Sequence, residues 1–403
     1  MGAQVTGFRP SSFLQAQTSR LRELSDGKKA LAAISGGVDS TISALLARQA
    51  LGERVIPVLI DTGFMREDEP EKVRDKLASP PLELKIRIVR SAGRFLKAVA
   101  DESLAEEKRK KFRETFYQVL KEESDKFGCE YLVQGTIAPD WIETQGGIKT
   151  QHNVLEQVGI NPRARYGFKL LEPLSELYKD QVRSLAKYLA VPNEFSERQP
   201  FPGPGLLVRC IGEVKKSKLE TLKRATSIVE DRLGAVGSNQ YFAAIIENKF
   251  ADEPSPKALR KVAADALDLP EDEVRAEAFL DRVTGVKGDE RAYGRLASIS
   301  LRNETREAFG WLHDKLNILQ SSIVVSFKDI TRVAVLVKDR RGEGQYSIMI
   351  RAVSTRDYMT ASVTPISWKT LKDTAEEVLK SSERIGRVYY DITPKPPATI
   401  EFE

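Results

Sequence analysis

The chain has 403 residues, a length that suggests two or three domains. Hydrophobic residues make up 41% of it, enough to form buried cores, and charged residues make up 30%. The net charge of +5 is small, and acidic and basic residues alternate, as in 106–111, which argues against a nucleic-acid-binding surface. The sequence has no run of eighteen apolar residues and no charged-then-apolar leader, so we expect no membrane span and a cytoplasmic location. Cys129 and Cys210 are too few for a disulfide framework or a Cys-x-x-Cys metal site.

The first half of the sequence predicts helices alternating with strands. Helices are expected over 10–25, 104–127 and near 179–190, and strands over 28–34, 54–60, 85–90 and 130–134. Apolar strands separated by helices predict a parallel sheet that is covered on both faces. Ligands bind such sheets at the carboxyl ends of the strands, so residues 35–41, 61–63 and 134–136 are expected to share one site.

The segment after the first strand has the composition of a phosphate-binding turn. It reads Ser35, Gly36, Gly37, Val38, Asp39, Ser40, Thr41. Glycines let the backbone approach an anion, and the N–H groups of the next helix complete the cradle. The Asp39 carboxylate is a ligand that Mg²⁺ would use. No lysine follows the glycines, so this is not an ordinary P-loop.

The pattern changes after the Pro-Phe-Pro-Gly-Pro-Gly string at 200–205, which is expected to be a rigid turn near a domain boundary. The second half predicts an α+β domain. Helices are expected over 214–233 and 367–382 and, with loops, within 250–275, and strands over 281–299, 322–338, 345–353 and 387–393. We therefore expect one domain over 1–212 and a second over 213–403, with an insertion around 240–345.

Several strings together resemble one family, the GMP synthetases. Ser-Gly-Gly-x-Asp-Ser is similar to the PP-loop of ATP pyrophosphatases, of which these enzymes are one group. The other matching strings lie at 60–66, 107–110, 134–140, 148–153, 172–174, 179–183, 200–205 and 390–403. Two of them are highly specific: Pro-Phe-Pro-Gly-Pro-Gly at 200–205 and Lys-Pro-Pro-Ala-Thr-Ile-Glu at 395–401. The resemblance implies an adenine-nucleotide α-hydrolase-like sheet domain followed by a dimerisation domain, here extended.

The family reaction adenylates the C2 oxygen of XMP with ATP, releases pyrophosphate, and then uses ammonia to form GMP and AMP. ATP and Mg²⁺ are the implied cofactors. The resemblance assigns ATP binding to Ala33, Ser35, Gly36, Gly37, Val38, Asp39, Ser40, Thr41, Ile60 and Gly135. It gives catalytic roles to Asp39, Ser40 and Lys179, with Asp39 on the metal. It assigns XMP binding to Arg109, Asp289, Gln345, Lys395, Thr399, Ile400 and Glu401.

The sequence departs from the commonest family pattern in two respects. Gln151 and Gln199 each replace a family histidine, so an acid–base role at those positions is in doubt, although glutamine still forms hydrogen bonds. The second half is also longer, and the segment 322–350 reads as a second copy of the α+β unit. Such a repeat would replace the dimer of compact members, so a homodimer and a monomer both stay open.

The glutaminase of the complete enzyme is missing from this sequence. That activity needs a Cys–His–Glu site, and neither cysteine lies on a Gly-x-Cys-x-Gly turn. We expect ammonia to come from solution or from a separate glutaminase subunit. Three alternatives share the phosphate loop: another PP-loop amidating ligase such as NAD synthetase, a tRNA-modifying PP-loop protein, and a catalytically inactive nucleotide-binding paralogue.

Overall fold

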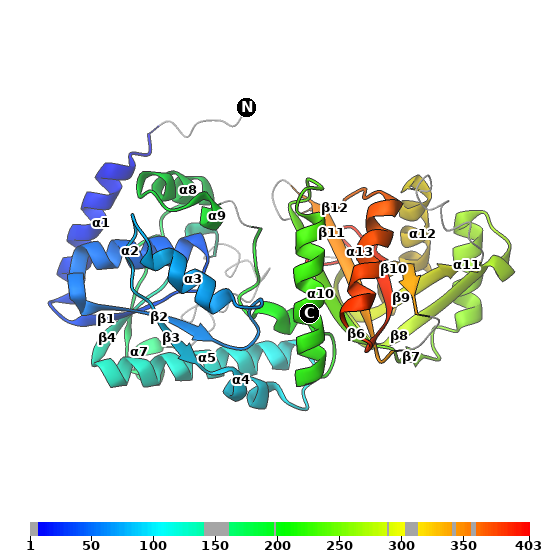
Figure 1. Ribbon diagram of the computed structural model, residues 1–403, viewed down its shortest axis with the longest axis horizontal. Coiled ribbons are helices and arrows are strands. Elements are labelled where there is room, and N and C mark those ends of the chain that lie inside the picture. Colours follow the sequence, from blue (N-terminus) through cyan, green and yellow to red (C-terminus); the bar gives the residue numbers. More distant parts are fainter. Residues whose placement is uncertain are drawn as a thin grey trace. The chain divides into compact units, whose positions relative to one another are not determined.

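The computed structural model describes residues 7–140, 161–196, 199–287, 290–302, 313–340, 344–355 and 360–403. The chain divides into two compact units (Figure 1). Unit 1 contains Met1–Ala98 and Lys111–Gly203, and unit 2 contains Val99–Lys110 and Pro204–Glu403. Within the described residues, no helix is long and apolar enough to cross a membrane.

Unit 1 is built on a five-stranded parallel sheet with the strand order β3-β2-β1-β4-β5. The strands are β1 (Lys29–Ala33), β2 (Val55–Asp61), β3 (Arg87–Arg90), β4 (Cys129–Val133) and β5 (Lys169–Leu171). The helices are α1 (Pro10–Ser25), α2 (Val38–Leu51), α3 (Glu69–Ala78), α4 (Ala92–Val99), α5 (Ala105–Phe127), α7 (Pro162–Tyr166), α8 (Lys179–Tyr188) and α9 (Asn193–Ser196). Residues 105–110 of α5 belong to unit 2.

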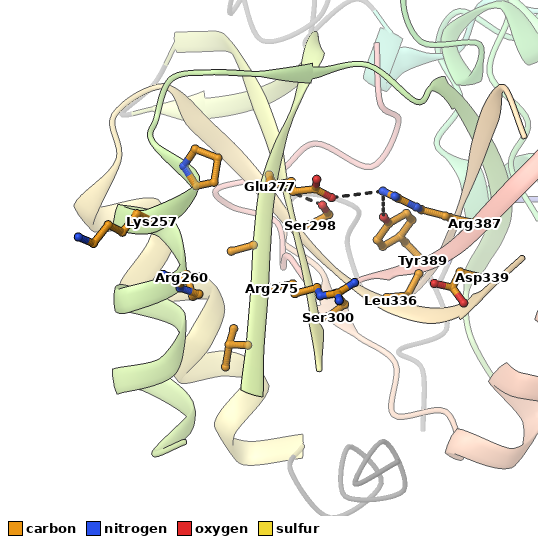
Figure 2. A pocket seen from close by; sticks show the side chains of 13 residues that line it. Lys257, Arg260, Arg275, Glu277, Ser298, Ser300, Leu336, Asp339, Arg387 and Tyr389 are labelled. Atoms are coloured by element: carbon orange, nitrogen blue, oxygen red, sulfur yellow. Dashed lines mark hydrogen bonds and ion pairs between the residues drawn. The ribbon is translucent and has the colours of Figure 1, made fainter. Parts of the chain in front are cut away.

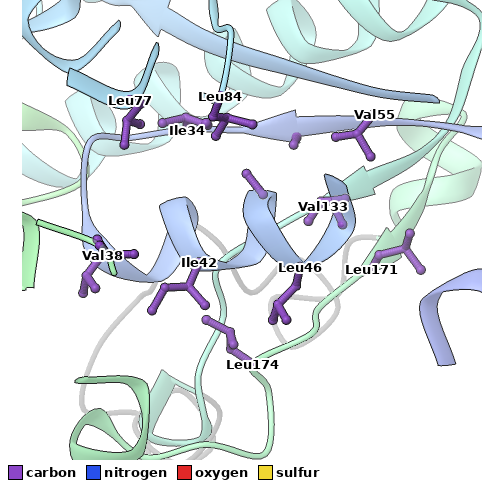
Figure 3. Close-up of a cluster of buried hydrophobic side chains, with 14 of the residues drawn as sticks. Ile34, Val38, Ile42, Leu46, Val55, Leu77, Leu84, Val133, Leu171 and Leu174 are labelled. Atoms are coloured by element: carbon purple, nitrogen blue, oxygen red, sulfur yellow. The ribbon is translucent and has the colours of Figure 1, made fainter. Parts of the chain in front are cut away.

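The sheet of unit 1 is covered on both faces because its strands are apolar on both sides. Figure 1 shows α2 on one face and α5 on the other. Residues Ile42 and Leu46 on α2 are fully buried among side chains of the strands (Figure 3). The chain leaves β1 in one direction along the sheet and later returns to β4 on its other side. The carboxyl end of β1 is thus the switch point, where ligands bind such sheets.

Unit 2 contains a mixed eight-stranded sheet with the order β12-β11-β13-β10-β9-β8-β7, and β6 also pairs with β11. The strands are β6 (Gln240–Glu247), β7 (Phe250–Ala251), β8 (Val274–Lys287), β9 (Glu290–Leu301), β10 (Ile330–Asp339), β11 (Tyr346–Ser354), β12 (Ser362–Val363) and β13 (Ile385–Asp391). The helices are α10 (Lys216–Leu233), α11 (Pro256–Leu267), α12 (His313–Ser326) and α13 (Trp368–Ser381). The predicted fold class, a parallel α/β domain followed by an α+β domain, is confirmed.

In the second half, one predicted strand is wrong in part and one strand was not predicted. The strand expected from residue 322 is the end of helix α12, and strand β10 begins only at Ile330. The sequence patterns predict neither a helix nor a strand where the structure has β6. Short apolar runs such as 323–325 have no period that distinguishes a strand from a buried helix, so sequence patterns fail there.

The core around α2 predicts a large loss of stability when Leu46 is shortened. Leu46 is 0% exposed, whereas Leu24 on α1 is 50% exposed. We expect Leu46→Ala to lower the free energy of unfolding by about 2–5 kcal/mol, because it removes buried methyl groups and leaves a cavity. The matched variant Leu24→Ala is expected to change it by less than about 0.5–1 kcal/mol. Urea unfolding of both variants measures the difference, and equal losses would contradict this packing.

Candidate active site

The phosphate loop is a compact turn held by its own hydroxyl groups. Ser40 Oγ accepts from the Ser35 N–H (3.2 Å) and donates to the Gly37 carbonyl oxygen (3.0 Å). Thr41 Oγ1 donates to the same carbonyl (2.9 Å). Gly36 has φ +82°, a conformation that favours glycine. Gly37 occupies the N-cap position of α2 and has no side chain to cap it. The first N–H groups of this fourteen-residue helix are therefore oriented to bind an anion.

Gly135, which follows β4, lies against the first turn of α2. A Cβ atom at this position would come within 2.6 Å of the Ser40 nitrogen and 2.8 Å of the Asp39 carbonyl carbon. Only glycine fits at that distance. The loops that follow β1 and β4 are therefore packed together at the carboxyl edge of the sheet, as the sequence predicts.

Asp39 and Lys179 form an ion pair at this edge. Lys179 is the first residue of α8, and its Nζ lies 2.5 Å from Asp39 Oδ2. The two side chains are 46% exposed for Lys179 and 25% exposed for Asp39, so the pair is open to ligands. The other oxygen of the carboxylate, Oδ1, is buried and has no hydrogen-bond partner. The pair thus brings one free carboxylate oxygen and one ammonium group to the phosphate loop.

The remaining predicted residues of unit 1 lie at the same ends of the strands. Ala33 ends β1, and Ile60 is the buried residue before the last position of β2. Asp61, which the sequence predicts at this edge, lies beside them and pairs with Arg90, which sequence patterns missed. Asp61 Oδ1 accepts from the Gly63 N–H (3.0 Å), and its Oδ2 pairs with Arg90 (3.0 Å). The family-matching string at 148–153, including Gln151 and His152, lies outside the described residues.

A second group of predicted residues lies in unit 2, along the segment 392–403. Lys395 exchanges two main-chain hydrogen bonds with Ala361 (2.8 and 2.9 Å). Ala398 forms a bridge with Gly285 on β8. The Glu403 N–H donates to the Val208 carbonyl (3.1 Å). The segment is therefore held along its length, by the sheet at Ala398 and by the 3-10 helix Gly205–Arg209 at Glu403.

Arg109 is brought to the end of this segment. Its guanidinium donates to the main-chain oxygen of Glu403, while its Nε is buried without a hydrogen-bond partner. Burial, and then the charge of Arg291, lower the pKa of Arg109. Glu106 accepts from Tyr293 (2.5 Å) and also pairs with Arg291. The Arg109 guanidinium thus lies at the end of the segment, and that of Arg291 is near enough to act on it electrostatically.

The other predicted residues of the segment have partners within unit 2. Glu401 accepts two hydrogen bonds from Arg209, at 2.9 and 3.0 Å. The Thr399 hydroxyl contacts the Thr284 hydroxyl (2.7 Å), and the Ile400 carbonyl accepts from Arg351 (2.9 Å). In the hydrogen bonds described, Gln345 is not joined to this segment: its main-chain oxygen accepts from the Asn248 N–H. Asp289 lies outside the described residues.

The end of the chain contains a further buried ion pair that sequence patterns did not predict. Lys108 Nζ donates to the carbonyl oxygens of Cys210 and Gly212 (2.9 Å each) and pairs with the Glu403 carboxylate. Lys108 and Glu403 are each 1% exposed. Burial raises the pKa of Glu403, and the charge of Lys108 opposes that shift. This pair fixes the last residue next to the turn that carries Cys210.

A separate cavity of about 300 Å³ lies in unit 2, lined by side chains of β8, β9, β10 and β13 and of the start of α11 (Figure 2). Its wall is charged, but several of its groups pair with one another. Arg387 donates to Glu277 (3.2 Å) and contacts the Tyr389 hydroxyl (3.5 Å), and Ser298 donates to the Glu277 carbonyl (3.3 Å). None of the predicted site residues lines this cavity, which therefore lies outside the candidate site.

Comparison with known proteins places the chain in a family. Residues 311–402 match the family model described as "GMP synthase C terminal domain". The B subunit of the glutamine-hydrolysing GMP synthase of Sulfurisphaera tokodaii is 45% identical over 396 residues, which are 98% of this chain and 100% of the relative. The chain belongs to this family of GMP synthase B subunits. The corresponding protein of Archaeoglobus fulgidus is 36% identical and is covered over 98% of its length, with 97% of this chain matched.

Among solved structures, an NH3-dependent NAD synthetase from Campylobacter jejuni matches 49% of this chain and 81% of its own chain. The sequence identity is 17% and the TM-score is 0.36. The family is set by the sequence relatives, which extend over both units of the chain. The resemblance to the GMP synthetases is therefore confirmed for the whole chain rather than for the phosphate loop alone.

The close approach of Gly135 to α2 predicts that a single methyl group disturbs the phosphate loop. We expect Gly135→Ala to weaken ATP binding by about tenfold or more, because the new Cβ displaces the first turn of α2. Gly93→Ala is the matched control, since a Cβ there meets no atom within 4 Å. Calorimetric titration with ATP tests both variants, and unchanged affinity in a folded Gly135→Ala protein would contradict the prediction.

Proposed function

We propose that the chain is the synthetase component of a GMP synthase, which adenylates XMP with ATP and aminates the product with ammonia. Membership of the family of GMP synthase B subunits defines the class of enzyme. The observation that carries the assignment to these residues is the phosphate loop at the carboxyl end of β1, with Asp39 and Lys179 beside it. We infer that ATP binds in unit 1 and that XMP is held by residues of unit 2.

The phosphates of ATP are assigned to the loop and the start of α2. The uncapped N–H groups of that helix supply hydrogen-bond donors. The hydroxyl groups of Ser35, Ser40 and Thr41 shape the turn, and those of Ser40 and Thr41 can donate to phosphate when they leave the Gly37 carbonyl. Gly135 lets the nucleotide approach the backbone, and Ala33 and Ile60 border the adenosine. The Lys179 ammonium binds a phosphate oxygen as a point charge when it leaves Asp39.

The residues also fit a magnesium ion, provided that the substrate completes its coordination. The buried Oδ1 of Asp39 has no hydrogen-bond partner and is therefore available as a ligand for a cation. Among the described residues, no group of three histidine, cysteine or carboxylate side chains could hold a metal by itself. Mg²⁺ is commonly held by one or two carboxylates together with phosphate oxygens and waters. When bound, Mg²⁺ would neutralise charge on the leaving pyrophosphate.

XMP is assigned to Arg109 and to the segment 392–403. Arg109 has a buried Nε without a hydrogen-bond partner and lies beside Arg291, an arrangement that an anionic ligand would stabilise. Lys395 suits the 5′ phosphate as a point charge. The Glu401 carboxylate keeps lone pairs beyond its two bonds to Arg209 and can accept from a purine N–H. Thr399 and Ile400, with Asp289 and Gln345, complete the proposed set.

The chemistry proceeds in two displacements. The C2 oxygen of XMP attacks the α-phosphorus of ATP, the bond to the β-phosphate oxygen breaks, and pyrophosphate leaves. Ammonia then forms a bond to C2, the C2–O bond breaks, and AMP leaves with a proton released to solvent. The residues of the chain contribute by holding both reactants and by stabilising charge on the phosphates.

Ammonia is proposed to come from a separate glutaminase, because the relatives are named as the B subunits of a glutamine-hydrolysing enzyme. Neither cysteine is suited to hydrolyse glutamine. Burial raises the pKa of the Cys129 thiol to about 11 and also raises that of Cys210. A catalytic cysteine needs a lowered pKa and access to its substrate.

We further propose a cytoplasmic enzyme with an ATP domain over 1–212 and an XMP domain over 213–403. A homodimer and a monomer both stay open.

The proposed reaction predicts equal amounts of GMP, AMP and pyrophosphate from XMP, ATP, Mg²⁺ and ammonium. We expect Asp39→Asn to lower the rate about 10²–10³-fold, because it removes a charge that orders the phosphates and the cation. Asp75→Asn, at an exposed position on α3 in the same unit, is the control and should keep the wild-type rate. Chromatography of the nucleotides measures all three products.

Two further outcomes test the assignment. Binding of ATP and XMP without formation of GMP would favour the catalytically inactive paralogue. Formation of GMP from glutamine by the purified chain, without ammonium, would contradict a separate glutaminase.

A further inference from the structure

Two strands of unit 2, β10 and β11, each carry one arginine among buried, mostly apolar residues. Arg332 is on β10 and Arg351 is on β11, and both are 0% exposed. They share one carboxylate: Oδ2 of Asp391 accepts from Arg332 (2.9 Å) and from Arg351 (2.7 Å). Two buried positive charges thus face one buried negative charge. Burial, and then the charge of Arg351, lower the pKa of Arg332 to about 9.

Further N–H groups of these arginines bind the main chain of the segment 392–403, while Nε of Arg332 donates to the Thr284 carbonyl on β8 (3.0 Å). Arg351 donates to the carbonyl oxygens of Thr393, Thr399 and Ile400, each at 2.9 Å. Arg332 donates to the carbonyl of Thr399 (2.8 Å) and to that of Glu401. Four carbonyl groups of the segment are therefore held by two side chains.

Such a cluster orients the backbone that it contacts, which a packed apolar core would not do. A guanidinium group has five donors in a fixed plane, so it fixes both the position and the orientation of the carbonyls that it binds. Buried ion pairs are weak contributors to stability compared with apolar side chains of similar volume. The shape of the segment, rather than stability alone, is what these contacts specify. The Arg332 guanidinium also lies over the Phe402 ring, 4.3 Å from its centroid.

A third buried arginine orients the carboxylate at the end of the same stretch. Arg209 is 0% exposed, forms two hydrogen bonds with Glu401, and lies 3.9 Å above the centroid of Phe242. Main-chain carbonyls and the Glu401 side chain are therefore fixed independently. The arginines on β10 and β11 hold the backbone, and Arg209 holds the carboxylate.

We propose that Arg332 and Arg351 are positioning residues for XMP, because they hold residues 399–401 in the conformation that binds this substrate. The inference rests on the proposed function, since it assumes that this segment contacts XMP. Neither arginine is assigned a contact with the substrate. Their effect is expected on the affinity for XMP and not on the ATP site, whose residues belong to unit 1.

Arg351→Lys and Arg351→Met test the proposal, with Arg275→Met, an exposed arginine on β8, as the control. We expect Arg351→Met to raise the KM for XMP about 10- to 100-fold, because displacement of a binding group by about an ångström has effects of that size. The KM for ATP should change less than about threefold. Arg351→Lys, which keeps the charge paired with Asp391 but loses the fork, should lie between wild type and Arg351→Met.

A second measurement remains informative if Arg351→Met does not fold. Hydrogen exchange of residues 392–403 is compared in Arg351→Lys, Arg332→Lys and wild type, with the amides of α10 as the internal reference. Faster exchange in the segment alone, together with a raised KM for XMP, supports the proposal. A folded lysine variant with unchanged exchange in this segment and unchanged KM for XMP overturns it. Equal rises in the KM for ATP and XMP also overturn it, because they indicate a general structural role.

The wild-type protein separates this inference from the function on which it rests. If wild type does not bind XMP in equilibrium dialysis, the proposed function and the positioning role are both rejected. If wild type binds XMP and the lysine variants bind it equally well, only the positioning role is rejected.

Discussion

The shared carboxylate of Asp391 is the interaction on which unit 2 depends most. It balances one of the two charges that Arg332 and Arg351 bring into the sheet, and without it both guanidinium groups would be buried unpaired. Removing one partner of a buried ion pair costs about 3–5 kcal/mol, because the other charge remains. The paired arginines can then satisfy the carbonyls of the segment 392–403, which could not otherwise be buried at the sheet without large desolvation penalties.

Buried polar groups also need hydrogen-bond partners in unit 1, but there some of them are left for a ligand. There, polar groups are left without protein partners at the place where a ligand is expected: the N–H groups at the start of α2 and the Oδ1 atom of Asp39. Glycine at 135 makes this possible, because it allows β4 and α2 to meet without a side chain between them. In unit 2, the arginines satisfy four carbonyls of the segment 392–403 internally, whereas unit 1 keeps some backbone groups available for phosphate.

The sequence was sufficient for features that are local. The phosphate loop could be predicted because strand, glycines and helix start follow one another directly along the chain, and the order of strands and helices in unit 1 follows from apolar periodicity.

Contacts between distant segments could not be predicted in this way. Arg332 binds residues 59 to 69 positions away, and only the pairing of β10 with β13 brings them together. The one available signal was a single arginine inside each apolar strand. Sequence patterns misplaced the boundary between α12 and β10 and did not predict β6, because short apolar runs carry no period. The roles of the individual site residues stay predictions.

The pairing of Glu401 with Arg209 bears on how a purine ring would be recognised. A carboxylate on a free segment would lose conformational entropy on binding, whereas this one is already fixed by two hydrogen bonds and by the carbonyl contacts on either side. Its remaining lone pairs point in fixed directions, so they favour a ring that presents N–H groups at matching positions. Selectivity for the base would then follow from the two arginines on β10 and β11 and from Arg209, which ends the short 3-10 helix Gly205–Arg209. A substitution at any of them is expected to act on recognition of XMP before it acts on the chemistry at the α-phosphate.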